Sequence, residues 1–162
     1  MSNQISSDFR VEGTVAPGFE SVKSLYEHEM RHMAEENARL RKLHDEGGGG
    51  CEVASLRSAV VDGLLRSLFH TAVLGTAAPG HVTLVANGGY GRGLLNPGSD
   101  IDLLFLLPRA SHSINKRLKE LIGDVLYPLF DLGFKVGHAS RSIPECISEA
   151  KRDPITRTSL FD

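Results

Sequence analysis

Residues 88–103 read GGYGRGLLNPGSDIDL. Apolar and β-branched residues flank this glycine-rich segment, so we expect a strand at 81–86, a loop at 88–98 and a second strand at 101–107. The second strand is apolar at nearly every position after Asp102, which is typical of a central strand covered on both faces. The segment therefore predicts two strands joined by a loop that carries its polar residues close to a buried sheet.

The two acidic residues of this segment are Asp100 and Asp102, and residues two apart on a strand point to the same side. Their carboxylates would lie roughly 6–7 Å apart and repel by about 2 kcal/mol at an effective dielectric constant of about 20. Mg²⁺ prefers hard oxygen ligands and reverses the sign of this interaction. We therefore expect the pair to bind metal ions that brace the attacking and leaving oxygens of a displacement at phosphorus.

Gly88 and Gly89 directly follow the first strand. A residue without Cβ lets a triphosphate approach the backbone amides closely, and a short helix starting there would add a favourable field for phosphate. Arg92 is placed either to reach a phosphate oxygen or to pair with an aspartate. A glycine-rich loop alone is usually only a turn, but its combination with the paired aspartates favours a phosphate-binding site.

The rest of the chain predicts an α/β (α+β) fold, with a small mixed sheet flanked by helices and an N-terminal helical pair. A third strand is expected at 134–140. A long helix is expected to begin at Ser113 and to kink or end at Pro128. The other expected helices cover 21–44, 52–74, 143–151 and the residues from 154 onwards. We expect residues 1–50 to form a lead-in and an amphipathic helix that the run 47–50 of four glycines ends, and 51–162 to form the main domain.

Composition limits the classes of function. A chain of 162 residues suits one domain, and its net charge of −2 argues against non-specific nucleic-acid binding. No apolar run is long enough for a membrane helix, and the first residues lack the pattern of a signal peptide. Cys51 and Cys146 lie far apart without metal-binding spacing, which favours a cytoplasmic protein. The chain stops inside an expected helix, so we expect it to be part of a longer protein.

A competing motif lies in the first helix, where residues 28–32 read HEMRH and match the H-E-x-x-H pattern of zinc peptidases. The spacing puts both histidines on one helix face. A zinc site also needs a third ligand and a setting that excludes water. The neighbouring Glu27, Glu35 and Glu36 indicate a solvated face instead. We therefore expect no zinc site here.

A pair of glycines, a short spacer and Asp-x-Asp on the next strand resembles the signature of the DNA polymerase β-like nucleotidyltransferase superfamily. The fuller strings GGYGRG and SDIDLL are similar, more narrowly, to those of the bifunctional PII uridylyltransferase/uridylyl-removing enzymes. Residues 131–138, DLGFKVGH, and 158–162, TSLFD, are similar to that family as well. The resemblance covers roughly 35–162.

This resemblance implies a polymerase β-like fold and a Mg²⁺-dependent reaction in which UMP passes from UTP to a tyrosine hydroxyl of the PII signalling protein, with release of pyrophosphate. It implies that Asp100 and Asp102 hold the metal and are catalytic. The implied nucleotide-binding residues are Gly88, Gly89, Arg92 and Ser99. No membrane is implied as a partner.

Two departures from the family pattern leave alternatives open. Members commonly have Glu where this chain has Leu94. The superfamily often adds a third carboxylate from a later strand, but 136–138 supplies none, and His138, Asp131 and Asp162 are the substitutes to consider. The alternatives are a nucleotide-binding module without catalysis, and a transferase of the same fold that uses another protein or an RNA end as its acceptor.

Overall fold

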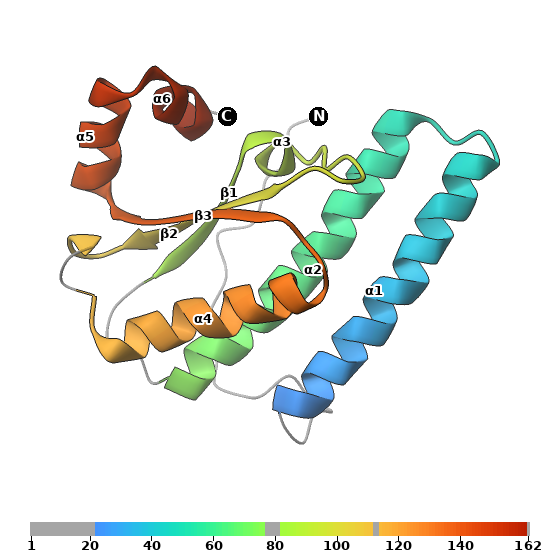
Figure 1. Cartoon of the computed structure of the whole chain (residues 1–162), viewed down its shortest axis with the longest axis horizontal. Coiled ribbons are helices and arrows are strands. Elements are labelled where there is room, and N and C mark those ends of the chain that lie inside the picture. The colour runs from blue at the N-terminus through green and yellow to red at the C-terminus, as the bar shows by residue number, and fades with distance from the viewer. Residues whose placement is uncertain (1–21, 77–81, 112–113, 162) are drawn as a thin grey trace, which may run out of the picture.

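A three-stranded mixed sheet forms the centre of the protein. The computed structural model describes residues 22–76, 82–111 and 114–161. Strands β1 (Thr83–Asn87), β2 (Ile101–Leu107) and β3 (Val136–Ser142) lie in the order β1-β2-β3 (Figure 1). β1 pairs with β2 antiparallel, and β2 pairs with β3 parallel. The small mixed sheet with flanking helices confirms the expected fold class, and β2 is the central strand as expected.

The core lies between one face of the sheet and two long helices, α2 (Gly50–Thr76) and α4 (Lys116–Asp131) (Figure 1). Alternate residues of β2 enter this core, and Ile101 and Phe105 are fully buried in it. Leu104 points to the other face and is also only 4% exposed. β2 is therefore buried on both faces, as its nearly continuous apolar sequence predicts.

The N-terminal helical pair is an antiparallel hairpin of α1 (Val22–Asp45) and α2, which run side by side in Figure 1. The glycine run makes the turn between them. Gly47 has a φ of +93°, a conformation that favours glycine, and the N–H of Gly48 donates to the carbonyl oxygen of Leu43 at 2.9 Å. α2 begins at Gly50, two residues before the expected start, because the turn needs only the first glycines of the run.

Two expectations for the long fourth helix are wrong. Asn115 caps it, since its side chain accepts a hydrogen bond from the N–H of Leu118 at 2.9 Å, whereas the expected start, Ser113, lies outside the described residues. Pro128 does not end the helix, because α4 continues to Asp131. The helix ends at Asp131, and Gly133 follows with a φ of +79°, a conformation that favours glycine.

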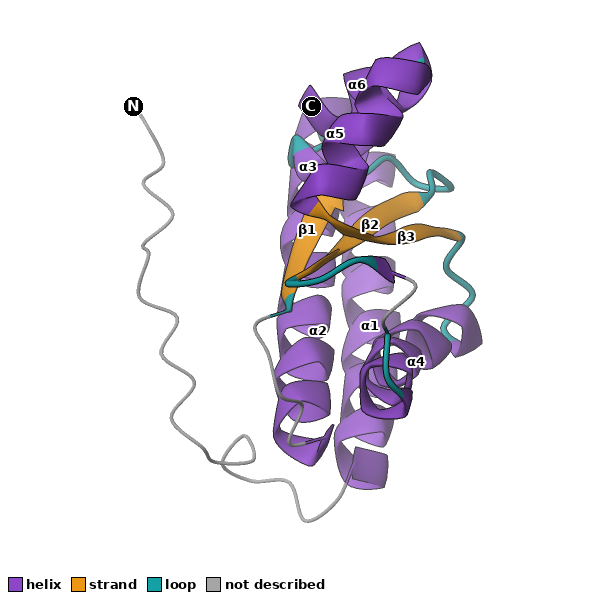
Figure 2. Ribbon diagram, turned by 90° about the vertical axis from the view of Figure 1, so that its left-hand side faces the viewer, coloured by secondary structure: helices purple, strands orange, loops and turns teal. Residues whose placement is uncertain are grey.

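The end of α4 also explains why β3 begins two residues later than expected. The N–H of Phe134 donates to the carbonyl oxygen of Leu129 at 3.0 Å, so this residue closes the helix end before the strand can start. β3 leads into α5 (Ile143–Arg152) and α6 (Pro154–Phe161). Figure 2 shows these two helices on the opposite side of the sheet from α4.

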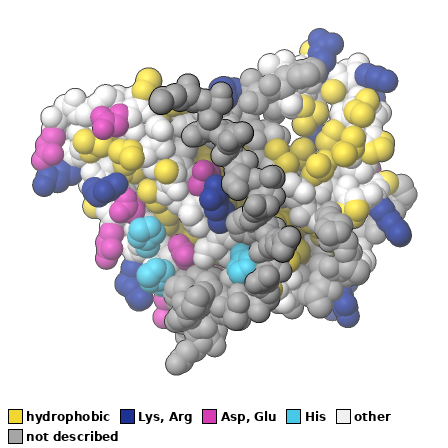
Figure 3. All heavy atoms as spheres, turned by 180° about the vertical axis from the view of Figure 1, so that it is seen from behind, with side chains coloured by type: hydrophobic (Ala, Val, Ile, Leu, Met, Phe, Trp, Pro, Cys, Tyr) yellow, Lys and Arg dark blue, Asp and Glu magenta, His cyan; other side chains and the backbone are white. Residues whose placement is uncertain are grey.

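Helix α5 is amphipathic yet buries none of its residues. Ile143, Ile147 and Ile155 of α5 and α6 are 59%, 52% and 80% exposed. Figure 3 shows apolar side chains gathered on this end of the molecule, seen from behind. In the part of the chain that the structure describes, no helix is long and apolar enough to cross a membrane.

Candidate functional site

Asp102 lies on the face of the sheet opposite the helical core. It is the second residue of β2, and its neighbours Ile101 and Leu103 both point into the core. Its partners in the register are Asn87 on β1 and Gly137 on β3. The side chain is half-buried, whereas five of the seven β2 residues are buried. The sheet therefore presents one carboxylate from the middle of its three strands.

Two glycines make the space that this carboxylate occupies. A Cβ built on Gly88 would lie 2.8 Å from Oδ2 of Asp102, and one built on Gly137 would lie 2.5 Å from Oδ1. Real Cβ atoms do not approach an oxygen so closely, so any larger residue at either position would push the carboxylate aside. Gly88 also has a φ of +61°, where a side chain is strained. The double-glycine bend and Asp102 are thus in direct contact.

Asp100 and Ser99 lie on the turn that enters β2. The N–H of Ser99 donates to the carbonyl oxygen of Asn96 at 3.1 Å. Pairing with the β3 segment starts at Ile101, whose N–H donates to the carbonyl oxygen of Lys135 at 2.8 Å. Asp100 therefore precedes the strand by one residue, in agreement with the expected strand at 101–107, and it is exposed. Asp100 and Asp102 are thus two residues apart in the sequence, one on the turn and one on the strand.

The GGYG segment forms a single helical turn, α3 (Gly88–Gly91), that packs tightly against β1. A Cβ on Gly91 would lie 2.6 Å from the carbonyl oxygen of Ala86, so only glycine permits this approach. Arg92 follows the turn, and its Nη2 lies 3.9 Å from the Cβ position of Gly89. The guanidinium of Arg92 thus lies beside the second glycine of the bend.

Helix α2 holds this loop at two points that the sequence did not lead us to expect. The hydroxyl of Tyr90 donates to Oδ1 of Asp62 at 2.5 Å, and the N–H of Leu95 donates to Oγ of Ser58 at 2.9 Å. Tyr90 and Ser58 are only 4% and 3% exposed. Burial, followed by the bond to Asp62, raises the pKa of the Tyr90 phenol above its usual range, so the hydroxyl stays a donor.

A sequence signal for these two anchors existed. Ser58 and Asp62 are polar residues four apart on a helix whose neighbouring positions Val61, Leu64 and Leu65 are buried. Residues four apart on a helix share one face. Polar residues on an apolar face need buried partners, and here the partners are both ends of the glycine-rich loop.

Leu94 lies where the family resemblance leads us to expect Glu. Its backbone N–H donates to the carbonyl oxygen of Gly89 at 3.0 Å, and its side chain is 42% exposed. The backbone at this position thus closes the loop, while the side chain faces outward. The loop keeps its shape without a polar side chain at this position.

Carboxylate oxygens such as those of Asp102 suit a hard divalent cation that takes its remaining ligands from a substrate. Mg²⁺ in proteins commonly takes one or two carboxylates and completes its shell with phosphate oxygens and water. Asp102 offers one such carboxylate, and the glycines beside its two oxygens, Gly88 and Gly137, have no side chain to occupy that space. Within the described ranges no group of three or more His, Cys, Asp or Glu residues gathers, so protein ligands here come in pairs at most.

His138, Asp131 and Asp162 are the residues that the sequence offers in place of a third carboxylate. His138 pairs with Leu103, which faces the core, so the register directs His138 away from Asp102. The β3 residues on the Asp102 side are Gly137, Ala139 and Arg141, none of them acidic. Asp131 is the last residue of α4, and Asp162 lies outside the described residues.

The HEMRH segment lies on α1 with both histidines exposed. The His28 and His32 rings stack with their centroids 6.4 Å apart. No third ligand joins them among the residues that the structure covers. The segment is a solvated helix face, as its charged neighbours predict.

Comparison with known proteins agrees with this geometry. A family of nucleotidyltransferase domains matches residues 74–135, which include the bend and both aspartates. Bifunctional uridylyltransferase/uridylyl-removing enzymes of Rhodopseudomonas palustris, Rhodospirillum rubrum and Azospirillum brasilense are 42%, 40% and 41% identical over 80%, 75% and 77% of this chain. The chain spans 14%, 13% and 14% of the lengths of these relatives. No solved structure matches it. The chain therefore belongs to the family of the bifunctional uridylyltransferase/uridylyl-removing enzymes, and it carries a nucleotidyltransferase domain.

Proposed function

We propose that this chain is a Mg²⁺-dependent nucleotidyltransferase that transfers UMP from UTP to a tyrosine hydroxyl of the PII signalling protein. One observation carries the proposal: the Asp102 carboxylate lies in a space made by Gly88 and Gly137, beside the glycine bend. This proximity supports a single site in which the acidic group holds a metal and the glycine backbone binds phosphate. The uridylyltransferase relatives support UTP as the donor, and the family resemblance supports PII as the acceptor.

In this proposal the glycine-rich loop binds the triphosphate. Gly88 and Gly89 leave backbone amides open to phosphate oxygens, and the Arg92 guanidinium beside Gly89 adds a charge-assisted bond. Ser99, on the turn before β2, supplies a hydroxyl donor. The anchors on α2 keep the loop in place through Tyr90 and Leu95, so that it does not have to be ordered when the nucleotide arrives.

Asp100 and Asp102 would hold Mg²⁺, which supplies positive charge to the phosphate oxygens as charge develops on them. The acceptor hydroxyl oxygen attacks the α-phosphorus in line. The bond from that phosphorus to the bridging oxygen of the β-phosphate breaks, and pyrophosphate leaves. The hydroxyl passes its proton to water as the new phosphodiester forms. The exposed position of Asp100 leaves room for a protein acceptor on that side.

We assign the reaction to residues 51–162. The helical hairpin of α1 and α2, which begins before residue 50, supports the site. Both cysteines are unpaired, which is consistent with work in the cytoplasm. The hairpin contributes directly, because Ser58 and Asp62 of its second helix hold the loop.

The test is transfer of label from α-labelled UTP to purified PII in the presence of Mg²⁺. Transfer should require Mg²⁺ and should be lost in Asp102→Asn, whose amide cannot provide the charge. Lys42→Gln, a change on the outer side of α1, serves as the control that should leave transfer unchanged. Absence of transfer by the wild-type chain, while a full-length relative is active in the same assay, would reject the proposal.

A second candidate is a nucleotide-binding module without turnover. The lack of a group of three metal-binding side chains within the described ranges favours it. Mg²⁺-dependent UTP binding without label transfer would support this candidate. A third, same-fold candidate uses another acceptor, and it predicts pyrophosphate release with a different protein or an RNA end. Comparing ATP, CTP, GTP and UTP as donors separates it from the first proposal.

A further inference from the structure

A groove of about 450 Å³ lies between the end of α1, the start of α2 and the loop that leads to Asp100. Its polar lining comes from all three segments. The lining residues that carry the argument are Asn37, Arg41, His44, Arg57, Asn96 and Pro97. Leu40 and Val53 add apolar walls. Space is open at the start of α2, where a Cβ on Gly50 would meet no atom within 4 Å.

The charge of this groove is of one sign. Arg41, His44 and Arg57 all line it, and none of the described residues that line it is Asp or Glu. The chain as a whole has a net charge of −2, so this concentration is local. Arg41 and His44 form no ion pair within 22–76, 82–111 and 114–161. Two arginines from different helices that face one cavity are a common arrangement for binding an anion.

Arg57 is the central residue of this arrangement. Its Nη1 donates to Oδ1 of Asn37 at 2.9 Å, and its guanidinium lies over the Phe134 ring, 5.7 Å from the centroid. Its Nε is buried and has no hydrogen-bond partner among the described residues. Buried donors are almost always paired, so the Arg57 guanidinium has hydrogen-bonding capacity that the described residues leave unused. Burial lowers the pKa of Arg57, and a bound anion would offset that desolvation.

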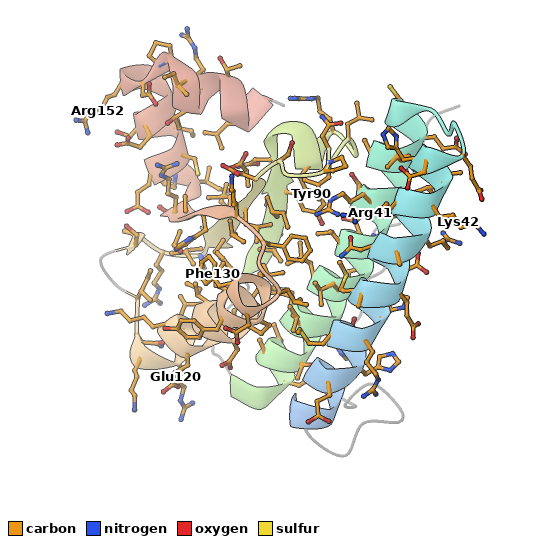
Figure 4. The ribbon with its side chains drawn as sticks, turned by 45° about the vertical axis from the view of Figure 1, so that its right-hand side comes forward. Arg41, Lys42, Tyr90, Glu120, Phe130 and Arg152 are labelled. Carbon is orange, nitrogen blue, oxygen red and sulfur yellow. The ribbon has the colours of Figure 1, made fainter. Side chains whose placement is uncertain are left out.

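The groove is distinct from the site at Asp102. Arg57 and Val53 belong to α2, which packs on the core face of the sheet, whereas Asp102 lies on the opposite face. The two places share only the loop, since Asn96 and Pro97 line the groove and Ser99 and Asp100 follow directly. Figure 4 shows Arg41 on the α2 side of α1 and Lys42 on its outer side.

We propose that this groove is a second binding site, for a small organic phosphate whose phosphate group lies between Arg41 and Arg57. The apolar walls at Leu40 and Val53 take the organic part. The volume is within the range of roughly 300–1,000 Å³ that small-molecule sites occupy. A ligand here contacts the loop ahead of Asp100, so it is placed to influence that loop. The proposal does not depend on transferase activity.

The test is an NMR titration of the full chain with ribose 5-phosphate, in excess EDTA so that no metal supports binding at Asp102. Backbone amides of residues 37–57 and 96–97 should shift in a saturable way. Arg41→Gln should weaken the affinity about tenfold or more, which corresponds to the loss of one charge-assisted contact. Arg41 is exposed, so this change leaves folding intact. Arg57→Lys should also weaken binding, because an ammonium cannot replace the planar fork.

Lys42→Gln is the matched control, since it removes the same charge one residue along α1 but faces away from the groove, with its side chain 76% exposed. It should leave the affinity unchanged. Equal weakening by Lys42→Gln and Arg41→Gln would show mere attraction to a basic surface and overturn the proposal. Shifts confined to residues 88–92, or no saturable shifts at all, would overturn it as well. Failure of UMP transfer would leave these results unaffected, so the two proposals can fail separately.

Discussion

Removing the Tyr90 hydroxyl tests whether α2 holds the glycine-rich loop. The change is Tyr90→Phe, which keeps the buried ring and removes only the hydrogen bond to Asp62. No cavity forms, because the remaining ring atoms stay in contact with the core. Any effect therefore reports on the bond itself.

The size of the effect follows from the burial of the two partners. A hydrogen bond to a charged group contributes about 1.5–3 kcal/mol. Tyr90 is 4% exposed, but Asp62 is only half-buried, so water can replace the lost donor at the carboxylate. We therefore expect the lower end, a loss of about 1.5 kcal/mol, or about twelvefold in the unfolding equilibrium. The loop also loosens, so the KM for UTP should rise more than kcat falls.

The assay is equilibrium denaturation by urea, followed by steady-state kinetics with UTP. Tyr127→Phe is the matched control, because Tyr127 is 69% exposed and donates no hydrogen bond within the described residues. Its stability should change by less than about 0.5 kcal/mol. A double-mutant cycle with Asp62→Asn isolates the pair. If Tyr90→Phe and Tyr127→Phe have the same stability, or if the cycle gives no coupling, the anchoring argument is refuted.

Three further changes test other parts of the site. Gly137→Ala should displace the Asp102 carboxylate and slow transfer about 10²-fold. Gly63→Ala on α2, where a Cβ meets nothing within 4 Å, should leave the rate unchanged. Equal rates for both variants would contradict the role of Gly137 in making space for the Asp102 carboxylate. Ser58→Ala leaves the buried N–H of Leu95 unpaired and should cost about 1–3 kcal/mol in urea denaturation, and an unchanged midpoint would count against this anchor. Hydrogen bonds from Ser142 and Ser111 lower the pKa of Glu145 to about 2 from 4.5, so the stability that they provide is present above pH 4.5 and is lost as the pH falls towards about 2. Thermal melts over that range should show a smaller pH dependence in Glu145→Gln, and an identical dependence would contradict this assignment.

Much of the fold was predictable because local sequence patterns determine it. The apolar run after Asp102 and the β-branched run before Gly88 indicated β2 and β1, and α/β alternation indicated the layers. The details of α4 that were predicted wrongly, its cap and its end, lie where neighbouring residues give similar sequence signals. Asn115 and Ser113 are both good caps by residue type, and it is the Asn115 side chain that accepts the capping hydrogen bond from Leu118. Pro128 was expected to disrupt α4, but the helix continues for three more residues beyond it.

The candidate site was less predictable, because it depends on pairing between distant segments. That Gly137 lies beside Asp102 follows from the parallel register of β2 and β3, which no local pattern encodes. The same register turns His138 away from the site. The hydrogen bonds from Tyr90 and Leu95 to α2 link residues 28 and 37 positions apart in the sequence. Polar residues on an apolar helix face signal such partners but do not identify them.

The central claim is that Asp102, in its glycine cradle, binds the metal that brings UTP to the site. Calorimetric titration of UTP into the wild-type chain and into Asp102→Asn, each with and without Mg²⁺, measures this directly. We predict that Mg²⁺ tightens UTP binding about tenfold or more in the wild type and has no effect in Asp102→Asn. Equal Mg²⁺ dependence in the two proteins would contradict the account.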